Sequence, residues 1–209
     1  LGAEITAKSP ADGYTVLFTT NSMAVNVSLY PKLNYNALTD LTPVALVAAV
    51  PLILVVHPSV PVRNVKELIA LAKAKPNQLN YGSSGNGSVS HLAAEQFNYL
   101  TGIKAQHVTY RGAGPATIGL MQAQVDVMFD NLNSQINQIR DGRLRALGVT
   151  SLKRSPLAPD LPAIAETVPG YESVTWFGMF GPKGLPADIV SKLNTAVNQT
   201  LADPEVKDK

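Results

Sequence analysis

The chain contains no cysteine, which excludes disulfides, thiolate metal sites and cysteine nucleophiles. This absence fits a cytosolic protein as well as a bacterial periplasmic one that avoids thiol oxidation. Charge is sparse and scattered, because 17 basic and 15 acidic residues give a net charge of +2. No block of like charge marks a nucleic-acid-binding arm. We therefore expect no nucleic-acid partner, and composition leaves the compartment open.

Long apolar runs are missing as well. The most apolar stretch, residues 44–56, is 13 residues long and contains Pro51, whereas a helix needs roughly 20 residues to cross a bilayer. We interpret it as a pair of buried strands and expect no direct membrane insertion. The opening residues, LGAEITAKSP, lack a basic region followed by an apolar one, so we expect no signal peptide in the sequence as given.

The 209 residues, 45% of them hydrophobic, suffice for one large core or two modest ones. Short apolar runs alternate with amphipathic segments in the middle of the chain, which predicts βα units and a mainly parallel sheet. Asn64 is expected to cap a helix that runs to Ala74. Gly114 and Pro115 are expected to take the first positions of another helix, and Asn133 to open a short one.

Both ends of the chain fall outside this five-strand set. We therefore expect two α/β lobes, one built from residues 1–50 and 171–209 and the other from residues 51–170. The first lobe offers only two convincing strands and about three helices. Nothing precedes its opening helix, where an α/β sheet would have its first strand. We expect this lobe to be incomplete and the chain to be truncated.

A loop of residues 80–95, NYGSSGNGSVSHLAAE, contains no lysine or arginine. Its glycines have the spacing of a nucleoside-triphosphate loop, but Ser88 stands where the lysine should be. It also fails the dinucleotide fingerprint, because Ser90 replaces the third glycine and no acidic residue ends the next strand. Neither nucleotide class is favoured.

Two other interpretations of this loop stay open. The segment GSSGN at 82–86 misses the nucleophile elbow G-x-S-x-G by one residue. A serine hydrolase using Ser83 or Ser84 with one of the histidines His57, His91 or His107 is therefore a hypothesis. The simplest alternative is a turn whose glycines serve only to reach positive φ and whose serines cap the next helix.

The interpretation that we favour is a helix N-terminus that binds an anion without any basic side chain. Hydrogen bonds to a charged group contribute about 1.5 to 3 kcal/mol each, and micromolar affinity needs about 8 kcal/mol. Several donors together would therefore hold a small carboxylate. The neutral side-chain donors expected here are Ser83, Ser84, Asn86 and Ser88.

Two further strand ends carry polar residues. FTTNSMAVN, at 18–26, breaks into small polar residues, and Asp130 ends another strand. Ligands of open α/β sheets bind at such carboxyl ends. Asp130 is also typical of a helix cap, and His91 of a residue that braces a loop. Trp176 and Phe177 either line a cleft or belong to a core.

The chain carries the segments SPADGYTVLF, VNVSLYPKLNYNALTDLTPV, HPSVPVRNVKELIALAKAKPNQLNYGSSGNGSVSHLAAE, YRGAGPA, VDVMFDN, GRLRALGVTSLKRSPLAPDLPAIAE and WFGMFGP. In these segments and their order it resembles the Bug-type periplasmic solute receptors of tripartite tricarboxylate transporters, over essentially all of its length. The resemblance implies a type II periplasmic-binding fold and a receptor that delivers a small organic acid to a membrane transporter. It implies no catalytic residue, no metal and no cofactor.

The resemblance also assigns ligand contacts to both lobes. It implies contacts from Thr20, Asn21 and Ser22 in the first lobe and from Ser83, Ser84, Asn86, Gly87, Ser88, His91 and Asp130 in the second. Met23 departs from the polar residue that many relatives carry there. Family members also begin with a strand and a Gly-rich loop, and they end with a further helix and strand, which this sequence lacks.

A ligand-sensing domain that regulates a signalling partner is the alternative function. LysR-type regulators use a similar fold, but they carry an N-terminal helix-turn-helix that does not occur in this sequence. The sequence does not name the ligand, because selectivity in a polar cleft depends on ordered water and distal side chains.

Overall fold

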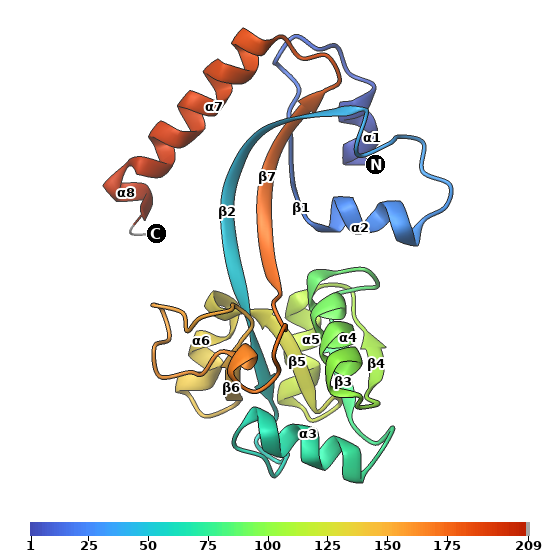
Figure 1. Ribbon diagram of the computed structural model, residues 1–209, viewed down its shortest axis with the longest axis vertical. Helices are drawn as coiled ribbons and strands as arrows, with labels where there is room; N and C mark the ends of the chain where they lie inside the picture. The colour runs from blue at the N-terminus through green and yellow to red at the C-terminus, as the bar shows by residue number, and fades with distance from the viewer. Residues whose placement is uncertain (208–209) are drawn as a thin grey trace. The chain divides into compact units, whose positions relative to one another are not determined.

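The computed structural model describes residues 1–207, in which the chain forms two compact units. The first unit combines Leu1–Ala49 with the chain from Trp176 onward, and the second is Val50–Thr175. The helices and strands of each unit are labelled in Figure 1. Each unit has its own core, and both contain helices and strands, which confirms the expected mixed α/β class.

The second unit extends past the boundary expected after residue 170. The Tyr171 side chain is fully buried, and its ring packs edge-on against Phe97 with centroids 5.8 Å apart. Its hydroxyl donates a hydrogen bond to the Ala93 carbonyl at 3.1 Å. These contacts join the segment that follows residue 170 to the second unit. The role of the two units as ligand-binding lobes stays a prediction.

The sheet of the second unit mixes parallel and antiparallel pairs. Its strands are β2 (Leu41–Val56), β3 (Asn80–Ser83), β4 (Gln106–Thr109), β5 (Val127–Asn131) and β6 (Arg145–Val149). Strand β3 pairs in parallel with β4 and β5, whereas β2 runs antiparallel to β5 and β6. The expected βα units are present, and β2 is the exception to the parallel pattern.

Strand β2 is one continuous strand of 16 residues, so the interpretation of residues 44–56 as a pair of strands is wrong. Pro51 lies inside it, one residue before pairing with β5 begins at Leu52. Proline cannot donate to a strand ladder, and Pro51 takes no part in the pairing with β5 that begins at the next residue. Figure 1 shows β2 as a single long arrow.

The helices of the second unit follow the expected order with shifted starts. They are α3 (Val65–Ala74), α4 (Val89–Thr101), α5 (Ala113–Met121), α6 (Leu132–Arg140) and the 3-10 turn η1 (Ile164–Glu166). Asn64 caps α3 as expected, because its side chain accepts from the Glu67 N–H at 2.9 Å. The N-cap of α5 is Gly112 rather than Gly114, and α6 begins after Asn131 rather than at Asn133. Gly112 has φ of 117°, which only glycine adopts easily.

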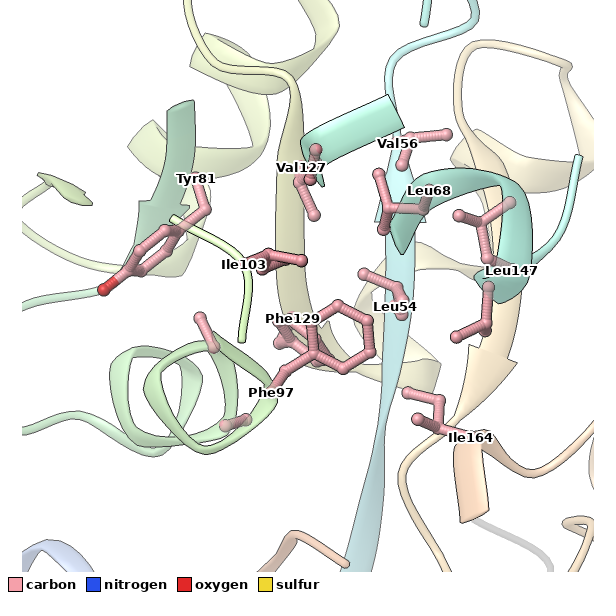
Figure 2. Packing of buried hydrophobic residues seen from close by; sticks show 14 of the residues in the cluster. Leu54, Val56, Leu68, Tyr81, Phe97, Ile103, Val127, Phe129, Leu147 and Ile164 are labelled. Carbon is pink, nitrogen blue, oxygen red and sulfur yellow. The ribbon is translucent and has the colours of Figure 1, made fainter. Parts of the chain in front are cut away.

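The buried half of β2 explains its unbroken hydrophobicity. Leu54 and Val56 belong to a core shared with α3 and α4, whereas Ile53 and Val55 belong to one shared with α5 and α6. A strand that is covered on both faces shows no alternation of polar and apolar residues. Figure 2 shows the first of these cores around Leu54.

The first unit has a thinner core. Its elements are α1 (Gly2–Ala7), β1 (Leu17–Thr20), α2 (Ser22–Leu29), the first part of β2, β7 (Val174–Pro182), α7 (Ala187–Ala202) and α8 (Pro204–Lys207). Strand β1 pairs antiparallel with β7, and β7 also neighbours β2. The core gathers around Met23, Ala37 and Leu41, and α7 contributes no buried residue to it.

No helix within residues 1–207 is long and apolar enough to span a bilayer.

Replacing Leu54 with alanine should destabilise the second unit strongly, because Leu54 is 0% exposed between its sheet and helices. Leu-to-Ala changes in cores cost about 2 to 5 kcal/mol. Leu46 lies on the same strand but is 64% exposed, so Leu46→Ala should cost no more than about 0.5 kcal/mol. Urea unfolding followed by circular dichroism measures both, and equal losses would contradict the placement of β2.

Candidate functional site

The candidate site lies at the carboxyl edge of the parallel strands. Strands β3, β4 and β5 end at Ser83, Thr109 and Asn131. A loop leads from β3 into α4 and from β4 into α5, whereas α6 begins directly after β5. Parallel strands end at one edge of a sheet, so helices α4, α5 and α6 all begin there. Figure 1 shows these elements within the second unit.

The loop between β3 and α4 uses most of its own backbone donors. Five N–H groups donate to atoms of the same segment at 3.0 to 3.3 Å. The Ser84 N–H donates to Ser90 Oγ, the Gly85 N–H to Ser83 Oγ, and the Gly87 N–H to His91 Nδ1. The Ser88 N–H donates to the Gly85 carbonyl, and the His91 N–H to Ser88 Oγ. Gly85 and Gly87 have φ of 146° and 72°, so the loop depends on glycine at both positions. The loop is therefore held in one conformation by its own hydrogen bonds.

Three backbone N–H groups lack a partner within residues 1–207, and they differ in exposure, because Asn86 is exposed, Val89 is half-buried and Ser90 is 4% exposed. Those of Asn86, Val89 and Ser90 donate to no group in the described part of the chain. Val89 and Ser90 occupy the first two positions of α4, where N–H groups have no partner inside the helix. The partial positive charge of the helix dipole is concentrated at the same end. The expectation that backbone N–H groups bind an anion here thus applies to these three positions only.

The loop hydroxyls brace the turn. Ser83 is 0% exposed, and its Oγ lies 2.6 Å from His107 Nε2. The Oγ atoms of Ser84 and Ser88 lie 3.1 and 3.0 Å from that of the buried Ser90. Asn86 is exposed, and its side chain bonds to no other residue within 1–207. Of the predicted side-chain donors in this loop, Asn86 alone is uncommitted.

Three aromatic rings stack behind the loop. The imidazoles of His91 and His107 have centroids 4.0 Å apart, and Tyr81 stacks on His107 at 4.9 Å. His91 Nδ1 accepts the Gly87 N–H, so this nitrogen carries no proton while the bond exists. Burial and then the nearby charge of His91 lower the pKa of His107. Burial and the hydrogen bond to Glu95 raise the pKa of Tyr81.

His107 was not among the predicted ligand-binding residues, and its place behind the loop follows from strand pairing. Tyr81 and His107 are paired in register on parallel strands, and Ser83 follows Tyr81 by two residues on the same face. The Ser83–His107 contact does not assemble a hydrolase triad within the described residues. Ser83 is buried, and no carboxylate there forms a hydrogen bond with His107.

Asp130 braces the start of α6. Its carboxylate is 5% exposed and accepts from the Asn131 N–H at 2.8 Å, Ser134 Oγ at 3.0 Å and Gln135 Nε2 at 2.5 Å. The same Gln135 amide donates to Thr117 Oγ1 of α5 at 2.8 Å. This network supports the helix-start interpretation of Asp130, and a direct ligand contact from it stays a prediction.

Thr20, Asn21 and Ser22 belong to the first unit, where β1 meets α2. Asn21 is the N-cap of α2, and the Ser22 N–H donates to Thr20 Oγ1 at 3.4 Å. Met23 is 6% exposed in the core of this unit, where its side chain is an apolar anchor. The role of the three polar residues in ligand binding stays a prediction.

The aromatic residues Trp176 and Phe177 on β7, expected either to line a cleft or to belong to a core, differ in their contacts. Trp176 packs against the core of the first unit, with its ring centroid 6.2 Å from that of Phe180. Phe177 stacks at 5.9 Å on Phe18, which is 58% exposed. The core interpretation therefore holds for Trp176.

Comparison with known proteins identifies the family of the chain. The model of the TctC family, described as the tripartite tricarboxylate transporter family receptor, matches residues 1–209. BugT of Bordetella pertussis is 37% identical over 209 residues, which cover 99% of this chain and 64% of BugT. The chain thus spans less than two thirds of the length of this relative.

Two solved structures from Rhodopseudomonas palustris are similar over almost the whole chain. Rpa4515, solved with adipate, has a TM-score of 0.89 and 40% identity, and the match covers 98% of this chain and 69% of Rpa4515. MatC, solved with bound malate, has a TM-score of 0.86 and 32% identity, with 99% and 71% covered. These similarities confirm the expected fold and the Bug-type resemblance. The chain belongs to the TctC family of tripartite tricarboxylate transporter receptors.

Proposed function

We propose that this chain captures a small organic carboxylate in the periplasm and delivers it to the membrane subunits of a tripartite tricarboxylate transporter. The proposal includes no catalytic step and no cofactor. Family membership supports the transport role, and the adipate and malate bound by two relatives support a dicarboxylate as the ligand class.

The available amides at the start of α4 are the single observation on which the ligand chemistry depends. Asn86, Val89 and Ser90 offer N–H groups at the positive end of a helix of 13 residues. Two or three hydrogen bonds to a charged group supply about 3 to 9 kcal/mol, which is comparable to the roughly 8 kcal/mol of micromolar binding. One carboxylate can therefore be held here without a cation.

Catalysis is not part of the proposal, for a geometric reason. A nucleophile must approach the reacting carbonyl closely, whereas Ser83 is 0% exposed and no carboxylate within residues 1–207 orients its hydrogen-bond partner His107. The preformed loop suits a receptor, because donors that are already held in place lose little entropy when a ligand binds.

Replacing Val89 with proline should weaken carboxylate binding by about 10- to 100-fold, because it removes one charge-assisted N–H donor. Proline is favoured at the first position of a helix, and the preceding Ser88 has the extended backbone, φ −68° and ψ 160°, that proline requires. Val89→Ala is the matched control, since it shortens the side chain but keeps the N–H. Isothermal titration of the full chain with adipate and malate measures both variants.

Equal affinities of Val89→Pro and Val89→Ala would contradict a role for this amide. Absence of binding to every member of a carboxylate panel, together with binding of a neutral sugar, would contradict the proposed function itself.

Acidification should lower the free energy of unfolding through His107. The pKa of His107 is lowered in the folded chain, so below about pH 6.5, the ordinary histidine value, the unfolded chain binds more protons and gains stability. Urea unfolding between about pH 7 and pH 5 should show this loss in the wild type and a shallower slope in His107→Gln. An unchanged slope in His107→Gln would refute the assignment.

A further inference from the structure

Positive charge is scarce in the part of the chain that builds the candidate site. Between residues 76 and 139 the only lysine or arginine residues are Lys104 and Arg111. The amides at the start of α4 can hold one carboxylate, but a dicarboxylate brings a second charge that has to be compensated. A side chain can compensate this second charge only if one of these two cations lies near the loop.

The two cations lie at opposite ends of β4. Lys104 precedes the strand, and its carbonyl accepts the Asn77 N–H at 2.9 Å. Arg111 follows the strand at the carboxyl edge of the sheet, where α4 and α5 begin. Arg111 is thus the cation on the same edge as the ligand loop.

Hydrogen bonds on both sides of Arg111 fix its backbone against that loop. The Tyr110 N–H donates to the Ser83 carbonyl at 3.0 Å, and the Gly112 N–H donates to the Ser84 carbonyl at 3.1 Å. The register of β3 and β4 ends at Ser83 and Thr109, so these two bonds extend the contact past the strands. The backbone of Arg111 is therefore held next to the loop that presents the amides.

The guanidinium of Arg111 is uncommitted. The side chain is exposed and forms no hydrogen bond or ion pair with any residue in the described range 1–207. The carboxylate of Asp130, at the end of β5, is buried and already accepts hydrogen bonds from Asn131, Ser134 and Gln135. No acidic side chain of this edge therefore neutralises Arg111.

We propose that Arg111 binds the second carboxylate of a dicarboxylate whose first carboxylate is held by the amides at the start of α4. Arg111 is then the residue that makes the receptor prefer dicarboxylates to monocarboxylates of equal length. A planar guanidinium suits this role because it can donate two parallel hydrogen bonds to one carboxylate. This inference rests on the proposed carboxylate-binding function.

The test compares adipate with hexanoate, which has the same number of carbons and one carboxylate. Titration of the full chain should show that Arg111→Gln weakens adipate binding at least tenfold and changes hexanoate binding less than twofold. Lys104→Gln, the matched control from the other end of β4, should leave both affinities unchanged. Arg111→Lys should retain more adipate affinity than Arg111→Gln, because lysine keeps the positive charge but cannot donate two parallel hydrogen bonds to one carboxylate.

The outcomes separate this inference from the proposed function. Equal losses of affinity for adipate and hexanoate in Arg111→Gln would mean that the charge of Arg111 attracts any anion. This result would overturn the inference. Unchanged adipate binding in Arg111→Gln, with tight binding by the wild type, would overturn it while leaving the proposed function intact. A wild-type chain that binds no carboxylate would overturn both.

Discussion

The parallel pairing of β3 with β4 and β5 is the constraint on which the candidate site depends. Parallel neighbours need a crossover, and here the crossovers are α4 and α5. Each crossover helix must begin at the edge where a strand ends, so two helix N-termini are brought to one edge by topology alone. Their unpaired N–H groups are a property of the fold before any side chain is chosen.

The serines and glycines of the loop after β3 determine which of its N–H groups find an acceptor within the loop. An unpaired N–H costs free energy when it is buried, and the serines and glycines of the loop satisfy most of its own groups. Positive φ at Gly85 and Gly87 turns the chain so that His91 and the serine hydroxyls can accept. The donors left over at Asn86, Val89 and Ser90 are consequently presented by a rigid frame.

Local signals in the sequence predicted the elements well. The capping of α3 by Asn64 and the end of α4 at Gly102, with φ of 68°, both depend on residues a few positions apart. The effect of Pro51 depends on strand pairing, which no local pattern gives: Pro51 lies just before the part of β2 that pairs with β5, and the strand continues through it.

The parts of the site that could not be predicted are contacts between distant segments. His107 touches Ser83 and His91 only because β4 lies in register beside β3. Arg111 is placed beside the loop by hydrogen bonds from its neighbours to Ser83 and Ser84. In the sequence His107 lies 24 positions after Ser83 and 16 after His91, Arg111 lies 27 positions after Ser84, and no periodic pattern links them. The absence of lysine and arginine from the loop itself therefore did not reveal that the backbone of Arg111 lies beside it.

Backbone donors and a single arginine contribute differently to recognition. The amides at the start of α4 are fixed by the fold, so they would lose no rotamer freedom on binding the carboxylate that we propose for them. An exposed arginine loses side-chain entropy of about 2 kcal/mol when it is ordered, so its net contribution is favourable only where a second negative charge meets it. In the proposed mode of binding, the fixed amides supply general affinity for acids, and the exposed guanidinium adds affinity only for acids with a second carboxylate within its reach.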